Sequence, residues 1–308
     1  MVEVLLLDLS GVLYEGSRLV PGALAAVTRA RDGGLTIRYV TNTSRQSRQQ
    51  LMAQLASFGL EVEELELFTA IDAARQWFDQ HKLRPYCLVH DAIRCDLADL
   101  DQSDPNAVLV ADAAEGFSYD NLNRAFQLCM AGAPLLAAGY NRYFRQDDAL
   151  LLDAGAFVRA LEFATGNEAI VVGKPSVDFF RQVMASAGSH KSALMVGDDI
   201  YGDVEGALNA GLQACLVRTG KYRNGDEAKI EGDFALVDSV VEAVDLALGY
   251  TPFPASVCGY LCPNLCMQSC TRQISAMAPV DVTQLGQASL EAKLPDLPPQ
   301  SDKKIAII

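Results

Sequence analysis

Short apolar runs alternate with amphipathic stretches at the start of the chain. Residues 2–8 (VEVLLLD) and 35–42 (LTIRYVTN) are apolar runs of strand length, and residues 21–34 between them have the spacing of a helix. Pro21 suits the first turn of that helix, and Gly33 suits its end. The chain is therefore predicted to begin with a strand, a helix and a second strand.

The same alternation continues and then returns late in the chain. Residues 44–59 predict a further helix, which Ser44 caps and Gly59 closes. The later segments that repeat the pattern are 168–188 (EAIVVGKPSVDFFRQVMASAG), 192–211 (SALMVGDDIYGDVEGALNAG) and 212–220 (LQACLVRTG). Repeated βα units predict an α/β fold with a doubly wound, Rossmann-like parallel sheet, in which ligands bind at the carboxyl ends of the strands.

Residues 70–168 lie between these two blocks and contain strand and helix patterns of their own. The strand candidates are 86–90, 106–112 and 134–139, and the helix candidates are 119–132 and 153–166. They could extend the same sheet. We interpret them instead as an inserted α/β cap domain, because the polar motifs described next lie only in the outer blocks. A core domain of residues 1–69 and 169–250 is therefore expected.

Polar side chains follow each predicted strand of the outer blocks. They are Asp8 and Ser10, then Thr41, Asn42 and Thr43, then Lys174, and finally Asp198, Asp199 and Asp203. Taken singly, each has a structural explanation as a helix cap, a turn residue or a solvated lysine. Four such groups at strand ends that meet at one edge of a sheet favour a shared site.

These residue types suit phosphoryl transfer. A carboxylate at a strand end, here Asp8, can attack phosphorus and form an aspartyl phosphate. Mg²⁺ prefers oxygen ligands, and Asp8, Asp198 and a main-chain carbonyl would supply them. The side chains of Thr41 and Lys174 would hold the phosphoryl oxygens. A turn at Gly11 would leave the Asp8 carboxylate exposed at the floor of the cleft.

The segments that carry these residues resemble the haloacid dehalogenase-like phosphatase superfamily. The resemblance extends over about residues 3–250 to the phospholysine phosphohistidine inorganic pyrophosphate phosphatase family, through the segments DLSGVLY, TNTS, LRPYCLVHDAIR, VVGKPS, MVGDDIYGDVEGA and VRTGKYR. It implies a Mg²⁺-dependent phosphatase that hydrolyses pyrophosphate and the P–N bonds of phospholysine and phosphohistidine through an aspartyl-phosphate intermediate. It also implies that the middle segment is an α/β cap over the active site.

The resemblance further implies roles for the carboxylates. Asp8 would be the nucleophile and a Mg²⁺ ligand, Ser10 would offer its main-chain carbonyl to the metal, and Asp198 would complete the metal site. Asp199 and Asp203 would surround these ligands rather than bind the metal.

The same resemblance implies a set of substrate contacts. Thr41 and Asn42 would touch the substrate, Lys174 would anchor the phosphate, and residues 112–119 of the cap would add further contacts. The binding partner would be a small phosphorylated compound or a phosphorylated protein side chain. A homodimer is plausible on the same ground.

Ser10 departs from the usual first motif of the superfamily, which places a second aspartate two residues after the nucleophile. That aspartate protonates the leaving group and then activates water, and such acid–base catalysis contributes about 10²- to 10⁴-fold in rate. A serine hydroxyl cannot replace it, because its pKa lies far above neutrality. Ser10 therefore indicates either a slow enzyme or a leaving group that needs little help, such as a protonated amine or phosphate. The structural alternative is that Ser10 makes a local turn hydrogen bond.

Composition limits the classes of partner. The formal net charge is −14 over 308 residues, which argues against nucleic acid and anionic membrane surfaces as partners. There is no run of apolar residues long enough to span a membrane and no cleavable signal pattern, so a cytoplasmic protein is expected. We predict that Cys87, Cys95, Cys129 and Cys215 are buried small apolar residues.

Four further cysteines lie close together near the C-terminus. Cys258, Cys262, Cys266 and Cys270 have the spacing C-x₃-C-x₃-C-x₃-C within a segment expected to span residues 251–275. In a reducing compartment this density favours iron–sulfur ligation, with zinc or no metal as the alternatives. The segment resembles the iron–sulfur region of dihydropyrimidine dehydrogenase and the glutamate synthase small subunit, which implies a [4Fe-4S] cluster.

The last residues, 276–308, form a proline-rich linker that ends in SDKKIAII. This ending resembles the opening strand of a dinucleotide-binding unit. A longer chain that continues into a flavin oxidoreductase domain is one reading, and a C-terminal strand is the other. The alternative function is then a non-catalytic phosphatase-like module fused to an iron–sulfur and flavin oxidoreductase.

Overall fold

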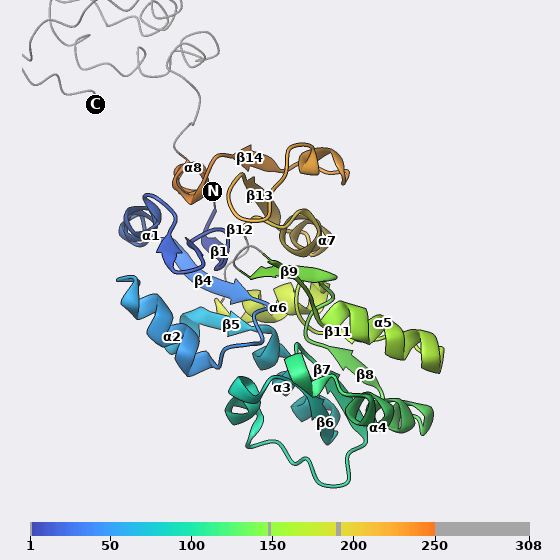
Figure 1. Ribbon diagram of the computed structural model, residues 1–308. Coiled ribbons are helices and arrows are strands. Elements are labelled where there is room, and N and C mark those ends of the chain that lie inside the picture. Colours follow the sequence, from blue (N-terminus) through green and yellow to red (C-terminus); the bar gives the residue numbers. More distant parts are fainter. Residues whose placement is uncertain (1, 147–148, 189–191, 250–308) are drawn as a thin grey trace, which may run out of the picture. The chain divides into compact units, whose positions relative to one another are not determined.

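The computed structural model describes residues 2–146, 149–188 and 192–249 (Figure 1). Its central sheet has the strand order β14-β13-β12-β1-β4-β5, and all neighbouring strands are parallel. The strands are β1 (Val4–Asp8), β4 (Thr36–Thr41), β5 (Leu67–Thr69), β12 (Ala193–Gly197), β13 (Gln213–Val217) and β14 (Ala235–Val237). The prediction of an α/β fold with a parallel core sheet is confirmed.

Strand β1 lies inside this sheet, between β4 and β12, and all five of its residues are buried. Successive side chains of a strand point to opposite faces. Leu5 and Leu7 therefore pack on one face, where the helices are α1 (Ala23–Asp32), α2 (Arg48–Ser57) and α8 (Val240–Ala247). A strand that is apolar on both sides can lie only between two layers of helices.

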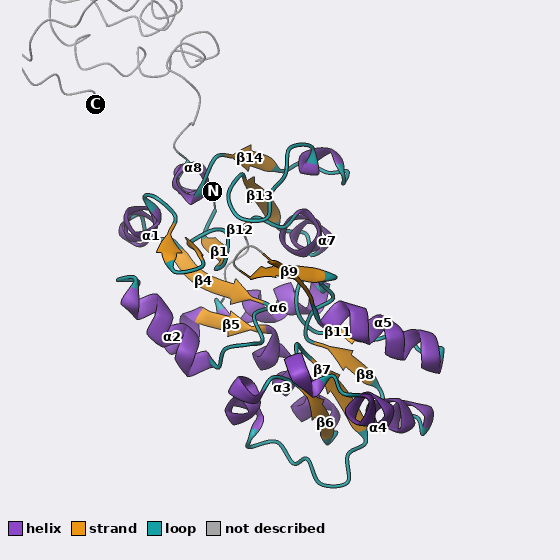
Figure 2. Ribbon diagram, viewed as in Figure 1, coloured by secondary structure: helices purple, strands orange, loops and turns teal. Residues whose placement is uncertain are grey.

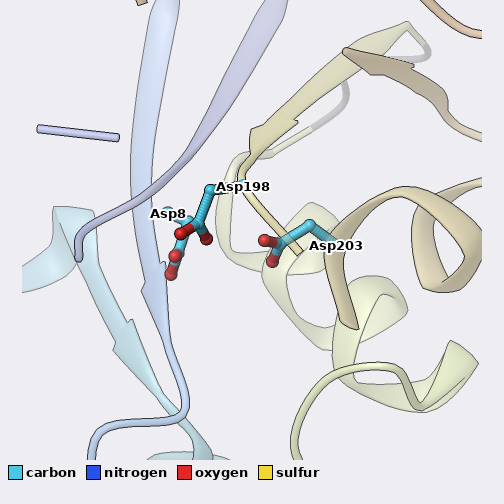
Figure 3. Close-up of side chains that lie close together, drawn as sticks. All are labelled: Asp8, Asp198 and Asp203. Carbon is cyan, nitrogen blue, oxygen red and sulfur yellow. The ribbon is translucent and has the colours of Figure 1, made fainter. Parts of the chain in front are cut away.

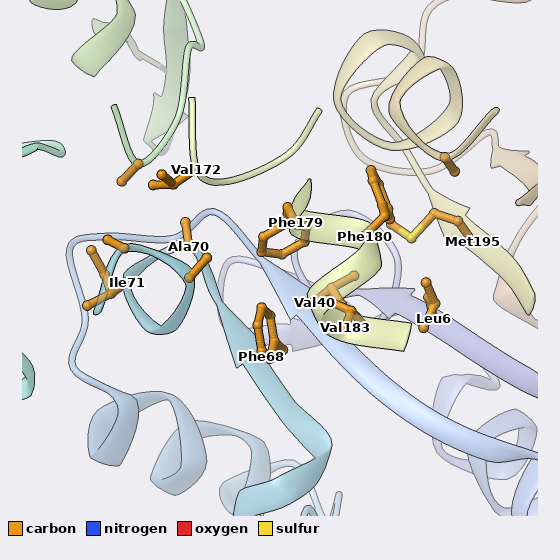
Figure 4. Packing of buried hydrophobic residues seen from close by; sticks show 14 of the residues in the cluster. Leu6, Val40, Phe68, Ala70, Ile71, Val172, Phe179, Phe180, Val183 and Met195 are labelled. Atoms are coloured by element: carbon orange, nitrogen blue, oxygen red, sulfur yellow. The ribbon is translucent and has the colours of Figure 1, made fainter. Parts of the chain in front are cut away.

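The opposite face of the central sheet packs against α6 (Val177–Ser186) and α7 (Gly206–Asn209), and α3 (Ala70–His81), which follows β5, contributes to the same apolar cluster. Figure 4 shows Leu6 of β1 and Val40 of β4 near two aromatic side chains of α6, Phe179 and Phe180. Phe179 also meets Phe68 of β5 edge to face, with the ring centroids 5.4 Å apart. Helix α6 thereby fixes the strands whose ends carry the predicted site.

The middle segment forms a second parallel sheet with the order β11-β8-β7-β6 (Figure 2). Its strands are β6 (Pro85–Leu88), β7 (Ala107–Val110), β8 (Leu135–Ala137) and β11 (Ile170–Val171). Helices α4 (Tyr119–Met130) and α5 (Ala154–Thr165) contribute residues to a separate apolar cluster with these strands. The middle segment therefore builds its own sheet and does not extend the central one.

The strand predicted at the start of residues 168–188 belongs to this second sheet, although it was assigned to the core. Ile170 and Val171 pair with Leu136 and Ala137 of β8. The chain then passes closely against its neighbours at Gly173, where a Cβ would lie 2.1 Å from the carbonyl oxygen of Ala138. The return to the core thus comes a few residues later than the predicted boundary at residue 169.

Shorter elements complete the described part of the chain. Two antiparallel hairpins are formed by β2 (Tyr14–Glu15) with β3 (Arg18–Leu19) and by β9 (Tyr143–Gln146) with β10 (Ala149–Leu152). The 3₁₀-helices are η1 (Glu64–Glu66), η2 (Asp91–Leu97), η3 (Ala114–Gly116) and η5 (Asp226–Ala228), of which only η2 is longer than one turn. A π-helical turn, η4 (Ile200–Glu205), follows β12.

Helix α2 is capped by Ser47 and not by Ser44. The Ser47 hydroxyl accepts a hydrogen bond from the main-chain N–H of Gln50, and the Gln50 side chain accepts one from the N–H of Ser47. This reciprocal pair satisfies two amide groups at the helix start. Ser44, three residues earlier, is left free to contact the inserted domain instead.

The cysteine prediction is confirmed for Cys129 and Cys215, which are buried. Burial raises the pKa of Cys215 to about 12 and that of Cys129 to about 11. Cys87 is only partly buried, and Cys95 is exposed in the η2 turn, so the prediction is wrong for Cys95. The η2 helix buries Ile93 and Leu97 and leaves Cys95 on its exposed side, which explains the difference.

The segments expected at residues 251–275 and 276–308 lie outside the described residues. The iron–sulfur ligation by Cys258, Cys262, Cys266 and Cys270 therefore stays a prediction. Among the described helices, none combines the length and the apolar character that a membrane span needs.

Candidate active site

Asp8 is the last residue of β1 and lies at the carboxyl edge of the central sheet. Only 7% of it is exposed, and β4 and β12 hold the strand from both sides. The chain then turns at Gly11, which has a φ of +90°. A Cβ at this position would lie 2.0 Å from Oδ2 of Asp198, so glycine is required both for the turn and for the approach of that carboxylate.

Asp198 follows β12, the neighbour of β1, and is 1% exposed. Its Oδ2 accepts a hydrogen bond of 2.7 Å from the main-chain N–H of Lys221, whereas its Oδ1 is buried without a partner. Burial raises the pKa of Asp198 well above its ordinary value, and the nearby charge of Asp8 raises it further. A bound cation would offset the cost of burying this unpaired carboxylate oxygen.

Lys174 links two carboxylates at the same edge of the sheet. Its Nζ lies 2.7 Å from Oδ1 of Asp8 and 2.6 Å from Oδ1 of Asp203, and all three side chains are buried. Burial alone lowers the pKa of Lys174, but the charges of Asp203 and Asp8 outweigh it and raise the pKa. The ammonium group therefore stays charged and holds the Asp8 carboxylate in place.

Asp203 projects from the π-helical turn η4. Its Oδ1 is bound to Lys174, and its Oδ2 accepts a hydrogen bond of 3.1 Å from the main-chain N–H of Asp199. Burial raises the pKa of Asp203 to about 6, although Lys174 opposes the shift. With both oxygens engaged inside the protein, Asp203 is suited to position Lys174.

Oxygen atoms of Asp8, Asp198 and Asp203 all lie within 4.8 Å of one another (Figure 3). This group fits a hard divalent cation such as Mg²⁺, because its donors are carboxylate oxygens and one of them, Oδ1 of Asp198, has no other partner. Asp8 and Asp198 are the residues that would hold the ion. The ligation by the Ser10 main-chain carbonyl stays a prediction.

The loop after β4 brings Thr41 and Asn42 to the site. The Thr41 hydroxyl accepts a hydrogen bond of 3.0 Å from the main-chain N–H of Thr43. The Asn42 side chain accepts one from the main-chain N–H of Lys174 at 2.9 Å and donates one to its carbonyl oxygen at 2.8 Å. Asn42 thus holds the backbone of Lys174, a contact that the sequence did not predict, and its substrate contact stays a prediction.

Asp199 and Lys221 form an ion pair at the rim of the site. The Lys221 Nζ lies 3.3 Å from Oδ2 of Asp199, whose Oδ1 also accepts hydrogen bonds from the N–H groups of Tyr201 and Gly202. Burial raises the pKa of Asp199, but these partners outweigh it and lower the pKa. Sequence reasoning missed Lys221, although its position just after the strand at 213–217 was a usable signal.

All the predicted phosphatase residues line a single cavity of about 520 Å³. Asp8, Ser10, Thr41, Asn42, Lys174, Asp198, Asp199 and Asp203 all contribute to its wall. The β2–β3 hairpin adds Glu15, and the inserted domain adds Asp112, Asn141, Phe144 and Asp153. Nothing in the local sequence pattern identifies the residues of the inserted domain, except for the expectation that substrate contacts begin near residue 112.

The loop after β4 also joins the core to the inserted domain. The Ser44 hydroxyl accepts a hydrogen bond of 3.1 Å from the main-chain N–H of Asp112. The guanidinium group of Arg45 binds the Asp112 carboxylate through Nε at 2.5 Å and Nη2 at 3.3 Å. It also lies over the Phe144 ring, 4.4 Å from the centroid. Residues of the core and of the inserted domain are therefore in direct contact at the cavity wall.

Two family models match parts of the chain. The model of haloacid dehalogenase-like hydrolases matches residues 5–102, and a second model of HAD-hydrolase-like proteins matches residues 171–243. The two matched ranges contain every predicted phosphatase residue, from Asp8 to Asp203.

Curated relatives are similar over most of the chain. The phospholysine phosphohistidine inorganic pyrophosphate phosphatase of Rattus norvegicus is 44% identical over 257 residues, which is 80% of this chain and 94% of the relative. The Homo sapiens protein of the same name is 43% identical over 257 residues, with the same coverage. The haloacid dehalogenase-like hydrolase domain-containing protein 2 of Homo sapiens is 42% identical over 246 residues, covering 79% of this chain and 95% of the relative.

Solved structures share the fold. The 4-nitrophenylphosphatase of Thermotoga maritima superimposes with a TM-score of 0.73 at 23% identity, covering 79% of this chain and 97% of that one. The glycerol phosphate phosphatase of Mycobacterium tuberculosis, solved in complex with magnesium, superimposes with a TM-score of 0.70 at 25% identity, covering 79% of this chain and 76% of that one. Both neighbours are named as phosphatases.

Proposed function

The chain belongs to the haloacid dehalogenase-like hydrolases and is a phosphatase of that family, and on this premise we propose that it uses Mg²⁺ and Asp8 to hydrolyse P–N bonds and pyrophosphate. The buried contact of Lys174 with both Asp8 and Asp203 is the observation that carries the proposal. A phosphoryl-transfer site requires a fixed nucleophile and a nearby positive charge. Lys174 meets both requirements, because it holds the Asp8 carboxylate in place and carries the charge.

The nucleophile of the proposed reaction is Asp8. One of its oxygens, Oδ1, is held by Lys174, so the other is available to attack phosphorus. The P–N or P–O bond opposite to the attack breaks, and the leaving group departs with its electron pair. Water then attacks the aspartyl phosphate, releases inorganic phosphate and restores the Asp8 carboxylate.

Mg²⁺ would be held by Asp8 and Asp198 and would supply positive charge against the phosphoryl oxygens when bound. The unpartnered Oδ1 of Asp198 supports this assignment. Lys174 adds a second positive charge at the same point, and the buried Thr41 lies at the end of the neighbouring strand as a donor for a phosphoryl oxygen.

The choice of bond follows from Ser10. This residue lines the cavity where an aspartate would otherwise protonate the leaving group, and its hydroxyl cannot do so near neutral pH. A nitrogen leaving group that is already protonated, or a phosphate that is a stable anion, departs without that help. The names of the curated relatives, which mention phospholysine, phosphohistidine and pyrophosphate, agree with this preference.

The proposal is tested with the full chain and Mg²⁺ on a phosphoramidate, inorganic pyrophosphate and an alkyl phosphate. We expect kcat/KM to be highest for the first two. Ser10→Asp should raise turnover of the alkyl phosphate relative to the phosphoramidate by roughly tenfold or more, because it restores an acid for the leaving group. An unchanged ratio would remove the explanation based on Ser10, and a wild-type enzyme that prefers the alkyl phosphate would contradict the proposed substrate class.

A further inference from the structure

The charges that line the cavity are unevenly balanced. Within the part of the chain that the structure describes, three cations, Arg45, Lys174 and Lys221, contribute to the cavity wall, and carboxylates outnumber them. Each cation is already paired with a carboxylate of the same wall: Lys174 with Asp8 and Asp203, Lys221 with Asp199, and Arg45 with Asp112. The carboxylates that remain include one, Asp153, that the inserted domain contributes.

Asp153 has no ion-pair partner among the described residues. Its Oδ1 accepts a hydrogen bond of 2.7 Å from the main-chain N–H of Ala154, at the start of α5, and the Asn141 side chain is a further hydrogen-bond partner. Neither partner carries a formal charge. Asp153 therefore places a net negative charge on the wall of the cavity.

The surroundings of Asp153 favour added positive charge at this point. Burial raises its pKa, and the charge of Asp112 raises it further, while Lys221 on the core side opposes the shift. A raised carboxyl pKa means that the site disfavours an unbalanced negative charge and gains from a cation. A substrate that brings an ammonium or imidazolium group would supply one, whereas the second phosphate of pyrophosphate would bring further negative charge.

We propose that Asp153 is a specificity-determining residue that binds the positively charged part of the leaving group, so that the enzyme prefers phosphorylated amines to pyrophosphate. This inference rests on the proposed function. Asp153 would then discriminate between the two proposed substrates. This residue lies on the inserted domain and not on the core.

The competing explanation is that Asp153 only caps helix α5. Aspartate, asparagine and serine are all good N-cap residues. Asp153→Asn therefore removes the charge and keeps the cap, and Asp153→Ser is a second variant that does the same with a smaller side chain. A role limited to capping predicts that neither variant changes the preference for one substrate over the other.

The experiment measures kcat and KM of the full chain with Mg²⁺ on two substrates, a short peptide that carries phospholysine and inorganic pyrophosphate. Asp153→Asn should lower kcat/KM for the phospholysine peptide about tenfold, mainly through KM, because a charge-assisted hydrogen bond is lost. It should raise kcat/KM for pyrophosphate, because a repulsive charge is removed. Asp120→Asn is the matched control, since Asp120 is an exposed carboxylate in the first turn of α4 in the same inserted domain.

The outcomes separate the inference from the proposed function. Opposite changes for the two substrates in both Asp153 variants, with no change in Asp120→Asn, would support the inference. Equal changes for both substrates, or none, would overturn it while leaving the phosphatase function intact. A wild-type enzyme that hydrolyses pyrophosphate but not the phospholysine peptide would also overturn it, whereas hydrolysis of neither substrate would show that the proposed function itself is wrong.

Discussion

Asp198 lowers the stability of the metal-free protein because it is a buried carboxylate with one oxygen unpaired. Burial and the charge of Asp8 raise its pKa in the folded state above the ordinary value of 3.8. The folded protein therefore binds the proton more tightly than the unfolded chain does. It follows that ionised Asp198 costs stability at neutral and alkaline pH, and that this cost disappears as the pH falls toward 4.

Asp198→Asn should accordingly stabilise the metal-free protein and abolish activity. We expect a gain of roughly 1–3 kcal/mol at pH 8 in the presence of a chelator, because an unpaired buried charge is removed. The gain should shrink toward pH 4, and Mg²⁺ should stabilise the wild type but not the variant. Thermal unfolding at several pH values measures all three effects. A variant that is less stable than the wild type at pH 8 would contradict the assignment.

Gly11 makes a matched pair with Gly34, because both have a positive φ, of +90° and +81°. A Cβ at Gly11 would lie 2.0 Å from Oδ2 of Asp198, whereas a Cβ at Gly34 would meet nothing within 4 Å. Gly34→Ala should cost only the backbone strain of about 1–2 kcal/mol and leave turnover unchanged. Gly11→Ala should also displace Asp198 and lower kcat at least 100-fold. Steady-state kinetics and urea unfolding of both variants test this, and equal loss of activity in the two would refute it.

At the scale of elements, the loop between β4 and α2 connects the catalytic sheet to the inserted domain. It follows Thr41, the last residue of β4, holds the backbone of Lys174 through Asn42, and reaches Asp112 through Ser44 and Arg45. One short segment thus touches the phosphoryl site, its lysine and the opposite wall of the cavity. Its geometry is set by contacts on both sides, so a change in one wall is transmitted to the other.

The ion pair of Arg45 with Asp112 should therefore contribute to both stability and substrate binding. Asp112 is nearly buried, with 6% of its side chain exposed, and Arg45 is about one-third exposed. A double-mutant cycle with Arg45→Ala and Asp112→Asn should give a coupling energy of about 1–2 kcal/mol, and each single variant should raise KM severalfold. The exposed pair of Arg94 with Asp91 in the same domain is the control, with a coupling energy near zero. Equal coupling in the two pairs would contradict the structural role of Arg45.

The sequence predicted the catalytic half of the site better than the substrate half. Asp8 ends β1 and Asp198 follows β12, and these neighbouring parallel strands bring their carboxyl ends to one edge, so the two carboxylates could be placed together in advance. Lys174 follows β11 of the second sheet, so it joins them for a reason other than the predicted one, through the chain's return to the core after that strand. Arg45, Phe144 and Asp153 reach the cavity only through the packing of one domain on the other. The spacing of residues along the chain does not predict such a contact. The π-helical form of the turn that carries Asp203 was not predicted either, because such a turn has no sequence periodicity.

The elements themselves were predicted where propensity and tertiary packing agree. Helix α5 spans Ala154–Thr165 with Asp153 and Gly166 as its caps, which agrees with the helix predicted at residues 153–166. The start of α2 was misplaced at Ser44, because two serines three residues apart are both good caps and only the reciprocal contact of Ser47 with Gln50 distinguishes them. The strand at Ile170 was assigned to the wrong sheet, since a run of apolar residues does not specify its partner.

At the scale of the whole molecule, the cavity is lined by residues of the core and of the inserted domain, so a ligand that fills it should stabilise the described part of the chain as a unit. Beryllium fluoride with Mg²⁺, a mimic of the aspartyl phosphate, should raise Tm by several degrees. A concentration one hundred times the Kd corresponds to about 2.7 kcal/mol. Asp8→Asn should lose this shift, and Ser17→Ala, a change outside the cavity wall, should keep it. A shift that persists in Asp8→Asn would exclude Asp8 as the acceptor of the mimic.

The position of β1 in the middle of the central sheet has a consequence for how the protein loses its structure. Amide hydrogens of a fully enclosed strand exchange with solvent only when the whole domain unfolds, whereas an exposed hairpin such as β9–β10 opens locally at little cost. Asp8, the proposed nucleophile, stands at the end of such an enclosed strand. Local unfolding of peripheral elements would thus leave Asp8 in position. Its carboxylate would be displaced only when the central sheet itself unfolds.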